Sequence, residues 1–205
     1  MNETWLPNEI RLINSVEIFQ LKPSIMKKAE GYLWDIRDAM IPELSSGIFP
    51  EGTDLVKGQL VRGENHKGFP FLSLDMPQFF TKTTYFTYRT LFWWGHYLGF
   101  ALILKGESLP QIIDSLMVNK ARPEWSDIYL ACAPTPWEWE RSDDNFKKIS
   151  QTPNSEIQAI IHSIQYVKLC RFYPTEDSSF TNLDWSAAAL DSYRAIINAV
   201  TEKWK

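Results

Sequence analysis

The segment that decides the fold is YFTYRTLFWWGHYLGFALIL, residues 85–104. It is dense in aromatic and aliphatic residues, contains no Pro, and carries a single charge, on Arg89. This composition is typical of β-strands, and Gly95 with His96 predicts a turn near its middle. We therefore expect a buried β-hairpin with arms 85–94 and 97–104. The second arm is apolar on both faces, as is typical of a central strand covered on both sides.

Around this hairpin, apolar residues at spacings of three and four predict helices at 24–41, 108–118, 155–164 and 184–204. We expect Ser24 to cap the first helix and Pro42 to end it, because proline disrupts a helix interior. Ser108 and Gln111 have the spacing of a capping box, and Asp184 is positioned to cap the last helix.

Further strands are expected at 59–62, 69–75, 127–133 and 166–173. GENHKG at 63–68 is typical of a turn, Met76-Pro77 is expected to close the second strand, and 46–58 and 133–145 are expected to be loops. Ile10–Leu21 fits either a short helix or an edge strand.

The order of these elements favours an α+β fold. Strands cluster in the middle of the chain with hairpin connections, and helices precede and follow them. We expect a central, mainly antiparallel sheet with helices packed chiefly on one face. The 205 residues are expected to form a single globular domain, 1–205.

Composition and charge exclude several classes of protein. The hydrophobic fraction of 44% and the charged fraction of 22% are those of a globular chain rather than a disordered one. The net charge of −4 provides no electrostatic footprint for nucleic acid or for an anionic membrane. The N-terminus lacks the pattern of a signal peptide, and the run 91–104 is too short to span a membrane. We expect a cytoplasmic protein with no nucleic-acid or membrane partner.

The chain holds nine Trp, eight Tyr and twelve Phe. This content indicates either a large aromatic core or a stacking pocket and contact surface, and composition does not separate the two. Cys132 and Cys170 belong to no metal-binding or redox motif, and each lies in an apolar run, so we expect buried free thiols.

No sequence motif assigns a reaction. The histidines His66, His96 and His162 have no ligand partners at a recognised metal spacing, so we expect no metal site and no cofactor. The nucleophile and phosphate-loop motifs GxSxG, GxGxxG and GxxxxGK[ST] are absent. RGENHKG at 62–68 is either a polar turn or a small anion site that presents Arg62, His66 and Lys67.

Three segments combine the residue types that bind ligands: the turn 62–66, the hairpin stretch 89–96 and the loop stretch 137–145. An antiparallel sheet can bring them to one end. Arg89 lies in a strand without another charge, so it needs a buried partner, and we expect Glu64 or Glu138. The functional interpretation is an aromatic cleft that binds an anionic ligand, and the structural one is an ion pair locked by Trp rings. The candidate ligand-binding residues are Arg62, Glu64, His66, Arg89, Trp94, His96, Trp137 and Glu138.

Two functional hypotheses follow from this set. The first is a non-enzymatic binding or interaction protein whose partner is a small molecule or another protein, with the oligomeric state left open. The second is an enzyme for a small anionic or polar substrate, with His66 or Glu138 as acid/base and Arg89 as charge stabiliser.

The same segments resemble a family of bacterial proteins of about 200 residues, close to the 205 of this chain. That family is classed as a domain of unknown function, and the resemblance implies no activity, cofactor or partner. This sequence has Trp139 after Pro136-Trp137-Glu138, where the family pattern has Tyr or His, so a role for histidine at that position does not carry over. The matching blocks cover about half of the 205 residues and are Arg62–His66, Gly68–Phe71, Leu74–Pro77, Arg89–Gly95 and Pro136–Glu138.

Overall fold

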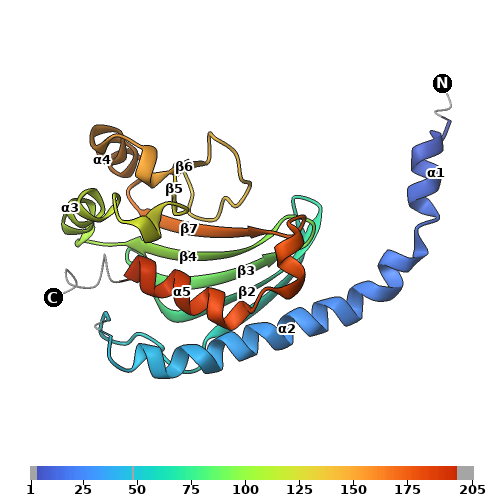
Figure 1. The fold of residues 1–205 in the computed structure, drawn as a ribbon, viewed down its shortest axis with the longest axis horizontal. Coiled ribbons are helices and arrows are strands. Elements are labelled where there is room, and N and C mark those ends of the chain that lie inside the picture. The colour runs from blue at the N-terminus through green and yellow to red at the C-terminus, as the bar shows by residue number, and fades with distance from the viewer. Residues whose placement is uncertain (1–3, 48, 198–205) are drawn as a thin grey trace.

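A seven-stranded antiparallel sheet forms the centre of the molecule in a computed structural model, which describes residues 4–47 and 49–197 (Figure 1). The strand order is β1-β2-β3-β4-β7-β5-β6, and neighbouring strands in this order run antiparallel. The fold is therefore α+β, as the sequence predicts. The strands are β1 (Gln59–His66), β2 (Phe69–Phe80), β3 (Tyr85–Trp93), β4 (Tyr97–Lys105), β5 (Tyr129–Ala131), β6 (Phe146–Lys148) and β7 (Val167–Pro174).

The predicted hairpin is confirmed. Strands β3 and β4 pair without a register shift from Tyr85 opposite Lys105 to Trp93 opposite Tyr97. Strand β4 is buried at every position except Lys105. It is central because β7 pairs along its other edge, which explains why its sequence is apolar on both faces.

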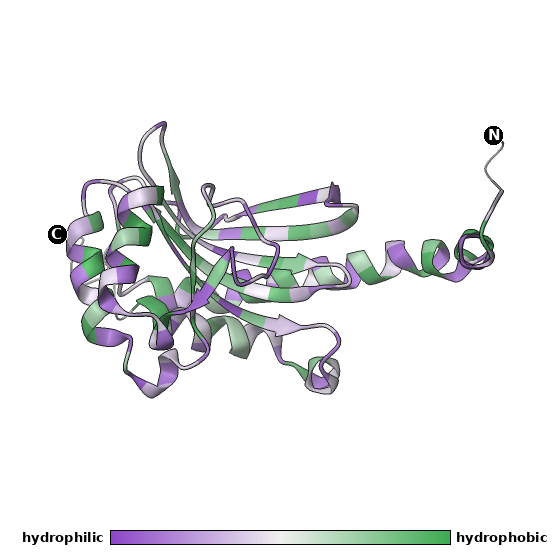
Figure 2. Cartoon of the chain, turned by 90° about the horizontal axis from the view of Figure 1, so that it is seen from above, coloured by the Kyte–Doolittle hydropathy of each residue, from purple (hydrophilic) through white to green (hydrophobic). Residues whose placement is uncertain are grey.

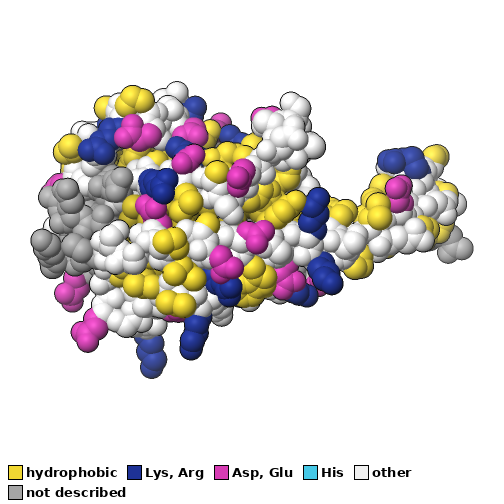
Figure 3. Space-filling model, turned by 60° about the horizontal axis from the view of Figure 1, so that its bottom comes forward, with side chains coloured by type: hydrophobic (Ala, Val, Ile, Leu, Met, Phe, Trp, Pro, Cys, Tyr) yellow, Lys and Arg dark blue, Asp and Glu magenta, His cyan; other side chains and the backbone are white. Residues whose placement is uncertain are grey.

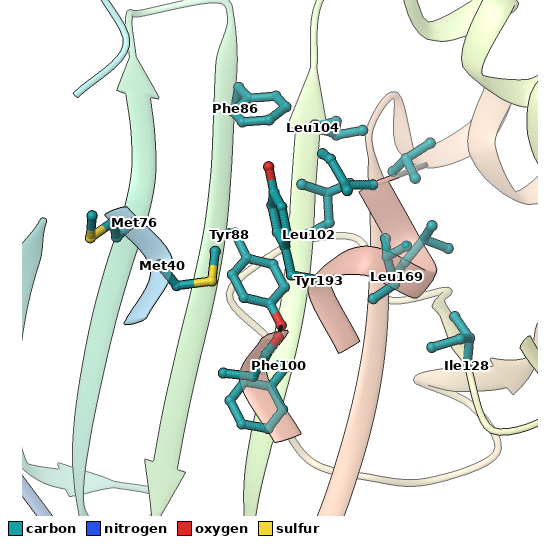
Figure 4. Packing of buried hydrophobic residues seen from close by; sticks show 14 of the residues in the cluster. Met40, Met76, Phe86, Tyr88, Phe100, Leu102, Leu104, Ile128, Leu169 and Tyr193 are labelled. Atoms are coloured by element: carbon teal, nitrogen blue, oxygen red, sulfur yellow. Dashed lines mark hydrogen bonds between the residues drawn. The ribbon is translucent and has the colours of Figure 1, made fainter. Parts of the chain in front are cut away.

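The helices pack chiefly on one face of the sheet, also as predicted. Helices α2 (Val16–Leu44) and α5 (Trp185–Ile197) share one hydrophobic core with the strands. Figure 4 shows Tyr88 and Phe100 of the hairpin beside Tyr193 of α5 and Met40 of α2. The hydroxyl of Tyr88 donates to the carbonyl of Ala189 at 2.8 Å, so a hydrogen bond fixes α5 to the sheet inside this core.

The shorter helices are α1 (Pro7–Ile13), α3 (Leu109–Asn119) and α4 (Asn154–Ile164). Asp184 caps α5 as expected, because its carboxylate accepts from the backbone N–H of Ala187. The capping box predicted at Ser108 and Gln111 is not formed, since the Ser108 side chain makes no capping bond. The last helix is described only to Ile197, so the part of the predicted helix at 198–204 lies outside the described residues.

Helix α2 is much longer than predicted, and both proposed boundaries were wrong. Pro23 and Pro42 lie inside it, and Ser24 donates its hydroxyl to the carbonyl of Leu21 rather than capping an N-terminus. Each proline removes one helical hydrogen bond. Pro42 is only two residues from the helix end, and Pro23 lies on an exposed stretch where water can satisfy the freed carbonyl. Of the two alternatives for Ile10–Leu21, the helical one is observed, interrupted at Asn14 and Ser15.

Strands β1 and β2 extend beyond their predicted limits. The turn predicted over 63–68 is confined to Lys67 and Gly68, whose φ angles of 52° and 90° lie in the left-handed region that tight hairpins require. Strand β2 continues past Met76-Pro77, and its pairing with β3 shifts register between Asp75 and Gln78. The bulge accommodates the proline within the sheet.

The opposite face of the sheet is covered by a loop, residues 132–145, instead of by helices α2 and α5. A second hydrophobic core lies under it, and it includes Trp93, Tyr97, Trp139 and Cys170. Both cysteines are free, Cys170 buried and Cys132 half-buried. Many aromatic residues lie in these two cores, which is one of the two alternatives that composition left open. The described Trp residues differ in exposure. The buried ones are Trp93, Trp125, Trp139 and Trp185, the half-buried ones are Trp34 and Trp94, and the exposed ones are Trp5 and Trp137.

No helix within residues 4–47 and 49–197 is both long enough and apolar enough to cross a membrane. Hydropathy is banded along the extended start of α2, where hydrophobic and hydrophilic residues alternate (Figure 2).

Candidate functional site

A pocket of about 230 Å³ opens on the loop-covered face of the sheet. Strands β2 and β3 form its floor, the end of β1 forms one side, and the loop 132–145 forms the other. Its size is below the 300–1,000 Å³ typical of pockets for drug-sized ligands, so it fits a smaller molecule. The lining residues are His66, Phe71, Arg89, Leu91, Trp137 and Trp139.

Arg89 is held in the pocket wall by Asp75, its direct cross-strand neighbour. Its Nε donates to Oδ1 of Asp75 at 2.8 Å and its Nη2 to Oδ2 at 2.6 Å, and Thr87 donates to the same carboxylate at 2.9 Å. Asp75 is 1% exposed. The expected partners Glu64 and Glu138 were therefore wrong. The pair neutralises the guanidinium, while Nη1 of Arg89 makes no hydrogen bond with the described residues.

Two tryptophans of the loop form the aromatic wall. The guanidinium carbon of Arg89 lies 4.7 Å from the ring centre of Trp137 and 6.0 Å from that of Trp139. Trp137 also contacts Phe80 and Tyr85, with ring centres 6.5 and 6.2 Å away. Trp137 is 42% exposed, so its ring covers the pocket from the solvent side while Trp139 is buried behind it.

Lys168 of β7 anchors the loop from below, a role that no sequence pattern indicates. Its ammonium donates to the carbonyls of Pro136 and Glu138 at 3.0 and 2.7 Å and lies 3.2 Å from the ring centre of Trp139. Burial lowers the pKa of Lys168 to about 7. Either protonation state can serve both carbonyls, because a neutral amine still has two N–H donors.

Glu138 is also used to shape the loop. Its Oε1 accepts from the backbone N–H of Trp139 at 2.8 Å and of Glu140 at 2.7 Å, and Nζ of Lys67 lies 3.0 Å away. Burial works to raise the pKa of Glu138, but these donors outweigh it and keep that pKa below its usual range. The carboxylate therefore stays ionised and occupied, which does not favour it as an acid/base group.

His66 reaches the pocket because of a β-bulge. Register shifts between Gly63 and His66, so the side chain of His66 faces the loop-covered side, with its ring edge-on to Trp93 at 4.9 Å. Its Nε2 is buried and makes no hydrogen bond with the described residues. Burial lowers the pKa of His66, with Glu138 opposing, which favours the neutral imidazole.

Arg62 and Glu64 do not join the site. Arg62 precedes the bulge and Glu64 lies within it, and both pair with residues of α2, Arg62 with Glu30 and Glu64 with Lys22. Both residues line a separate groove between α2 and β1. The predicted convergence of this turn with the other segments holds for His66 alone.

Trp94 and His96 lie outside the pocket lining as well. Trp94 is half-buried against the helix-side core. His96 stacks on Trp93, with ring centres 3.7 Å apart and planes inclined by 16°. Burial lowers the pKa of His96. Of the eight candidates, the structure places His66, Arg89 and Trp137 in the pocket wall and Glu138 in the loop beside it.

The pocket also contains residues that sequence reasoning missed: Phe71, Leu91 and Trp139. Phe71 and Leu91 are ordinary strand residues without a distinguishing signal. Trp139 lies in the same WEWE run as Trp137. In the structure the ring of Trp137 is exposed and that of Trp139 is buried. Among the described residues, no three His, Cys, Asp or Glu side chains gather in an arrangement that could hold a metal ion.

Comparison of the chain with protein-family models, curated proteins and solved structures finds no match. Function is therefore inferred from the geometry of the pocket.

Proposed function

We propose that the protein binds a small, flat, uncharged ring compound in the pocket between β2, β3 and the loop 132–145. The observation that carries this proposal is the composition of the lining, in which three aromatic side chains stand beside Arg89 and His66. Nη1 of Arg89 and the buried Nε2 of His66 have no hydrogen-bond partner among the described residues.

The charge balance favours an uncharged ligand over the anionic one expected from the sequence. Asp75 already neutralises Arg89 through two short hydrogen bonds, so the guanidinium offers one N–H and little net charge. Neutral His66 adds a second hydrogen-bonding atom. Aromatic rings bind flat ligands by stacking, while a few placed polar groups fix the orientation.

Four of the five blocks that carry the resemblance to the bacterial family meet at this pocket. They contribute His66, Phe71, Arg89, Leu91 and Trp137, which leaves only Trp139 outside them. Membership of that family, a cytoplasmic location and the lack of a nucleic-acid partner stay proposals.

The test is a titration with nicotinamide, phenol and adenine, followed by the indole N–H resonances of ¹⁵N-labelled protein. For ligands this small we expect a Kd of about 1 mM or below for at least one probe. Trp137→Ala should weaken binding at least tenfold. Trp34→Ala is the matched control, because Trp34 also lies against an arginine, Arg37, but is on α2, away from the pocket. Absence of binding by all three probes, or equal effects of the two variants, contradicts the proposal.

A second candidate function is catalysis with His66 as base, favoured by its unpartnered, neutral imidazole at the pocket wall. His66→Gln separates the two functions. Chemical conversion of a bound probe that is lost in His66→Gln while binding persists would assign an enzyme. Binding without conversion supports the binding protein.

A further inference from the structure

The N-terminal arm, residues 4–25, projects from the body of the molecule with its hydrophobic side chains uncovered. It consists of α1 and the first part of α2 and extends past the edge of the sheet (Figure 1). No residue of the arm is buried, and the first buried residue of α2 is Ala29. The exposed large hydrophobic residues of the arm are Trp5, Leu6, Ile10, Leu12, Ile13, Val16, Ile18, Phe19, Leu21 and Ile25.

These residues have the spacing of a packing face. Ile18 and Ile25 are seven apart and continue, at spacings of four and three, the stripe by which α2 packs on the sheet. The apolar stripe of α2 thus continues toward the N-terminus past the part that packs on the sheet. Leu6, Ile10 and Ile13 repeat the same spacing on α1. The buried part of the stripe is Ala29, Leu33, Ile36, Met40 and Leu44.

The exposed area has the size of a dimer interface. Trp5 is 71% and Phe19 is 72% exposed. With aromatic side chains of about 150–250 Å² each, these two alone present roughly 200–350 Å². The ten side chains together present on the order of 1,000 Å², above the 300–600 Å² of the largest patch on a typical monomer and close to the roughly 800 Å² that each partner buries in a standard interface. Figure 3 shows hydrophobic side chains along the arm.

The charges of the arm are balanced and self-complementary. Its ionisable side chains are Glu9, Arg11, Glu17 and Lys22. Glu9 is used within α1, where its carboxylate accepts from the N–H of Leu6, and Lys22 pairs with Glu64 of the body. Arg11 and Glu17 remain, six residues apart, one on each side of the break between α1 and α2. A membrane-binding helix is rich in Lys and Arg instead, which this arm is not.

We propose that the arm pairs antiparallel with the arm of a second copy of this chain around a two-fold axis near Asn14 and Ser15. In this register Arg11 of one copy lies opposite Glu17 of the other, and the two-fold axis forms the pair twice. The same register places Ile10 opposite Ile18, both on the apolar stripe of their helices. Apolar stripe residues therefore face each other, and an Arg11–Glu17 pair lies beside them on each side of the two-fold axis.

The test is the mass of the full chain in solution by light scattering and by sedimentation, over a concentration series. We expect a dimer at roughly 10 µM, within the affinity range of interfaces of this size. Ile18→Asp, at the position that faces Ile10 of the other copy, should weaken dimerisation at least a hundredfold without changing the circular dichroism of the body. Val118→Asp is the matched control, because Val118 is 77% exposed but lies on α3, and this variant should stay dimeric.

Charge reversal tests the antiparallel register. Arg11→Glu alone and Glu17→Arg alone each create two like-charge contacts and should weaken the dimer, whereas the double variant restores opposite charges and should recover it. A monomeric wild type, an oligomer larger than a dimer, or a double variant weaker than either single one overturns the proposal. A monomer that binds phosphatidylglycerol–phosphatidylcholine vesicles through Phe19 overturns it in favour of a lipid surface.

Discussion

Removal of Asp75 should destabilise the protein far more than removal of an equally close but exposed aspartate. Two Asp–Arg pairs in this chain have the same shortest N–O distance, 2.6 Å: Asp75 with Arg89 and Asp38 with Arg37. The side chain of Asp75 is 2% exposed and that of Asp38 is 62% exposed. Burial is therefore the variable that separates them.

The expected magnitudes follow from that difference. Asp75→Ala leaves a guanidinium that is only 17% exposed without its carboxylate, and breaking such a pair costs about 3–5 kcal/mol. Thr87 loses its acceptor in the same variant. Asp38→Ala breaks an exposed pair, which is worth about 0–1 kcal/mol. With total stabilities of about 5–15 kcal/mol, both variants should still fold.

The assay is urea unfolding followed by far-ultraviolet circular dichroism at pH 7 and one protein concentration. With a slope of about 2 kcal/mol per M, Asp75→Ala should lower the midpoint by about 2 M and Asp38→Ala by less than about 0.5 M. Arg89→Leu should also destabilise, and the double variant Asp75→Ala with Arg89→Leu should cost much less than the sum, because no buried charge is left alone. Equal midpoints for Asp75→Ala and Asp38→Ala, or single effects that add within about 0.5 kcal/mol, would refute the reasoning.

Three further predictions concern the loop-covered face. Gly63→Ala brings a Cβ into steric overlap with the ring of Phe71, so overpacking of about 1–3 kcal/mol should lower the melting temperature. An unchanged melting temperature counts against this close approach. The pKa of Lys168 is lowered from 10.5 to about 7, so the unfolded chain binds more protons between these pH values, and this group makes stability rise with pH there. Lys168→Met should remove that rise, measured as urea midpoints from pH 7 to 9, and parallel pH profiles for the two proteins contradict it. Burial raises the pKa of the Cys132 thiol, and it raises the pKa of the Cys170 thiol to about 12. Both thiols should therefore react slowly with a disulfide reagent in the native protein at pH 8, and completely in urea. Rapid labelling of Cys170 in the native protein would show that this residue is not buried.

Much of the fold was predictable because its decisive signals are local. The central hairpin is indicated by an unbroken apolar run with one glycine turn, and α5 by helical spacing with Asp184 at its start. Helix boundaries were less predictable, because Pro23 and Pro42 indicate helix ends that packing and exposure override. Local preference decides an element only where tertiary contacts do not outweigh it.

The site was only partly predictable, because one bulge decides which side chains share a face. Strict alternation along β1 puts Arg62, Glu64 and His66 together, whereas the register shift sends His66 to the loop side and leaves the other two with α2. A single inserted residue reverses the face of everything that follows it. No composition or spacing signal in GENH marks that shift.

The pairing of Arg89 with Asp75 could have been predicted from the sequence. Asp75 is the lone charge in FLSLDM, as Arg89 is in the following strand, and consecutive antiparallel strands place such residues opposite each other. Two isolated opposite charges in neighbouring buried strands are a signal of a cross-strand pair. Lys168 is different, because its partners are backbone carbonyls of a loop. Every residue has a backbone carbonyl, so the sequence does not indicate which ones accept from Lys168.

The unequal covering of the sheet gives the protein two regions that can change independently. Helices α2 and α5 stabilise one face through the larger apolar core, whereas the loop 132–145 is attached to the other face by the buried ring of Trp139 and by hydrogen bonds from Lys168, Tyr97 and Tyr166. If the pocket binds a ring compound as proposed, a substitution at Trp137 should change which ligand it prefers and leave the helix-side core as it is. The sequence of this loop could then be exchanged on a scaffold whose stability depends mainly on the other face.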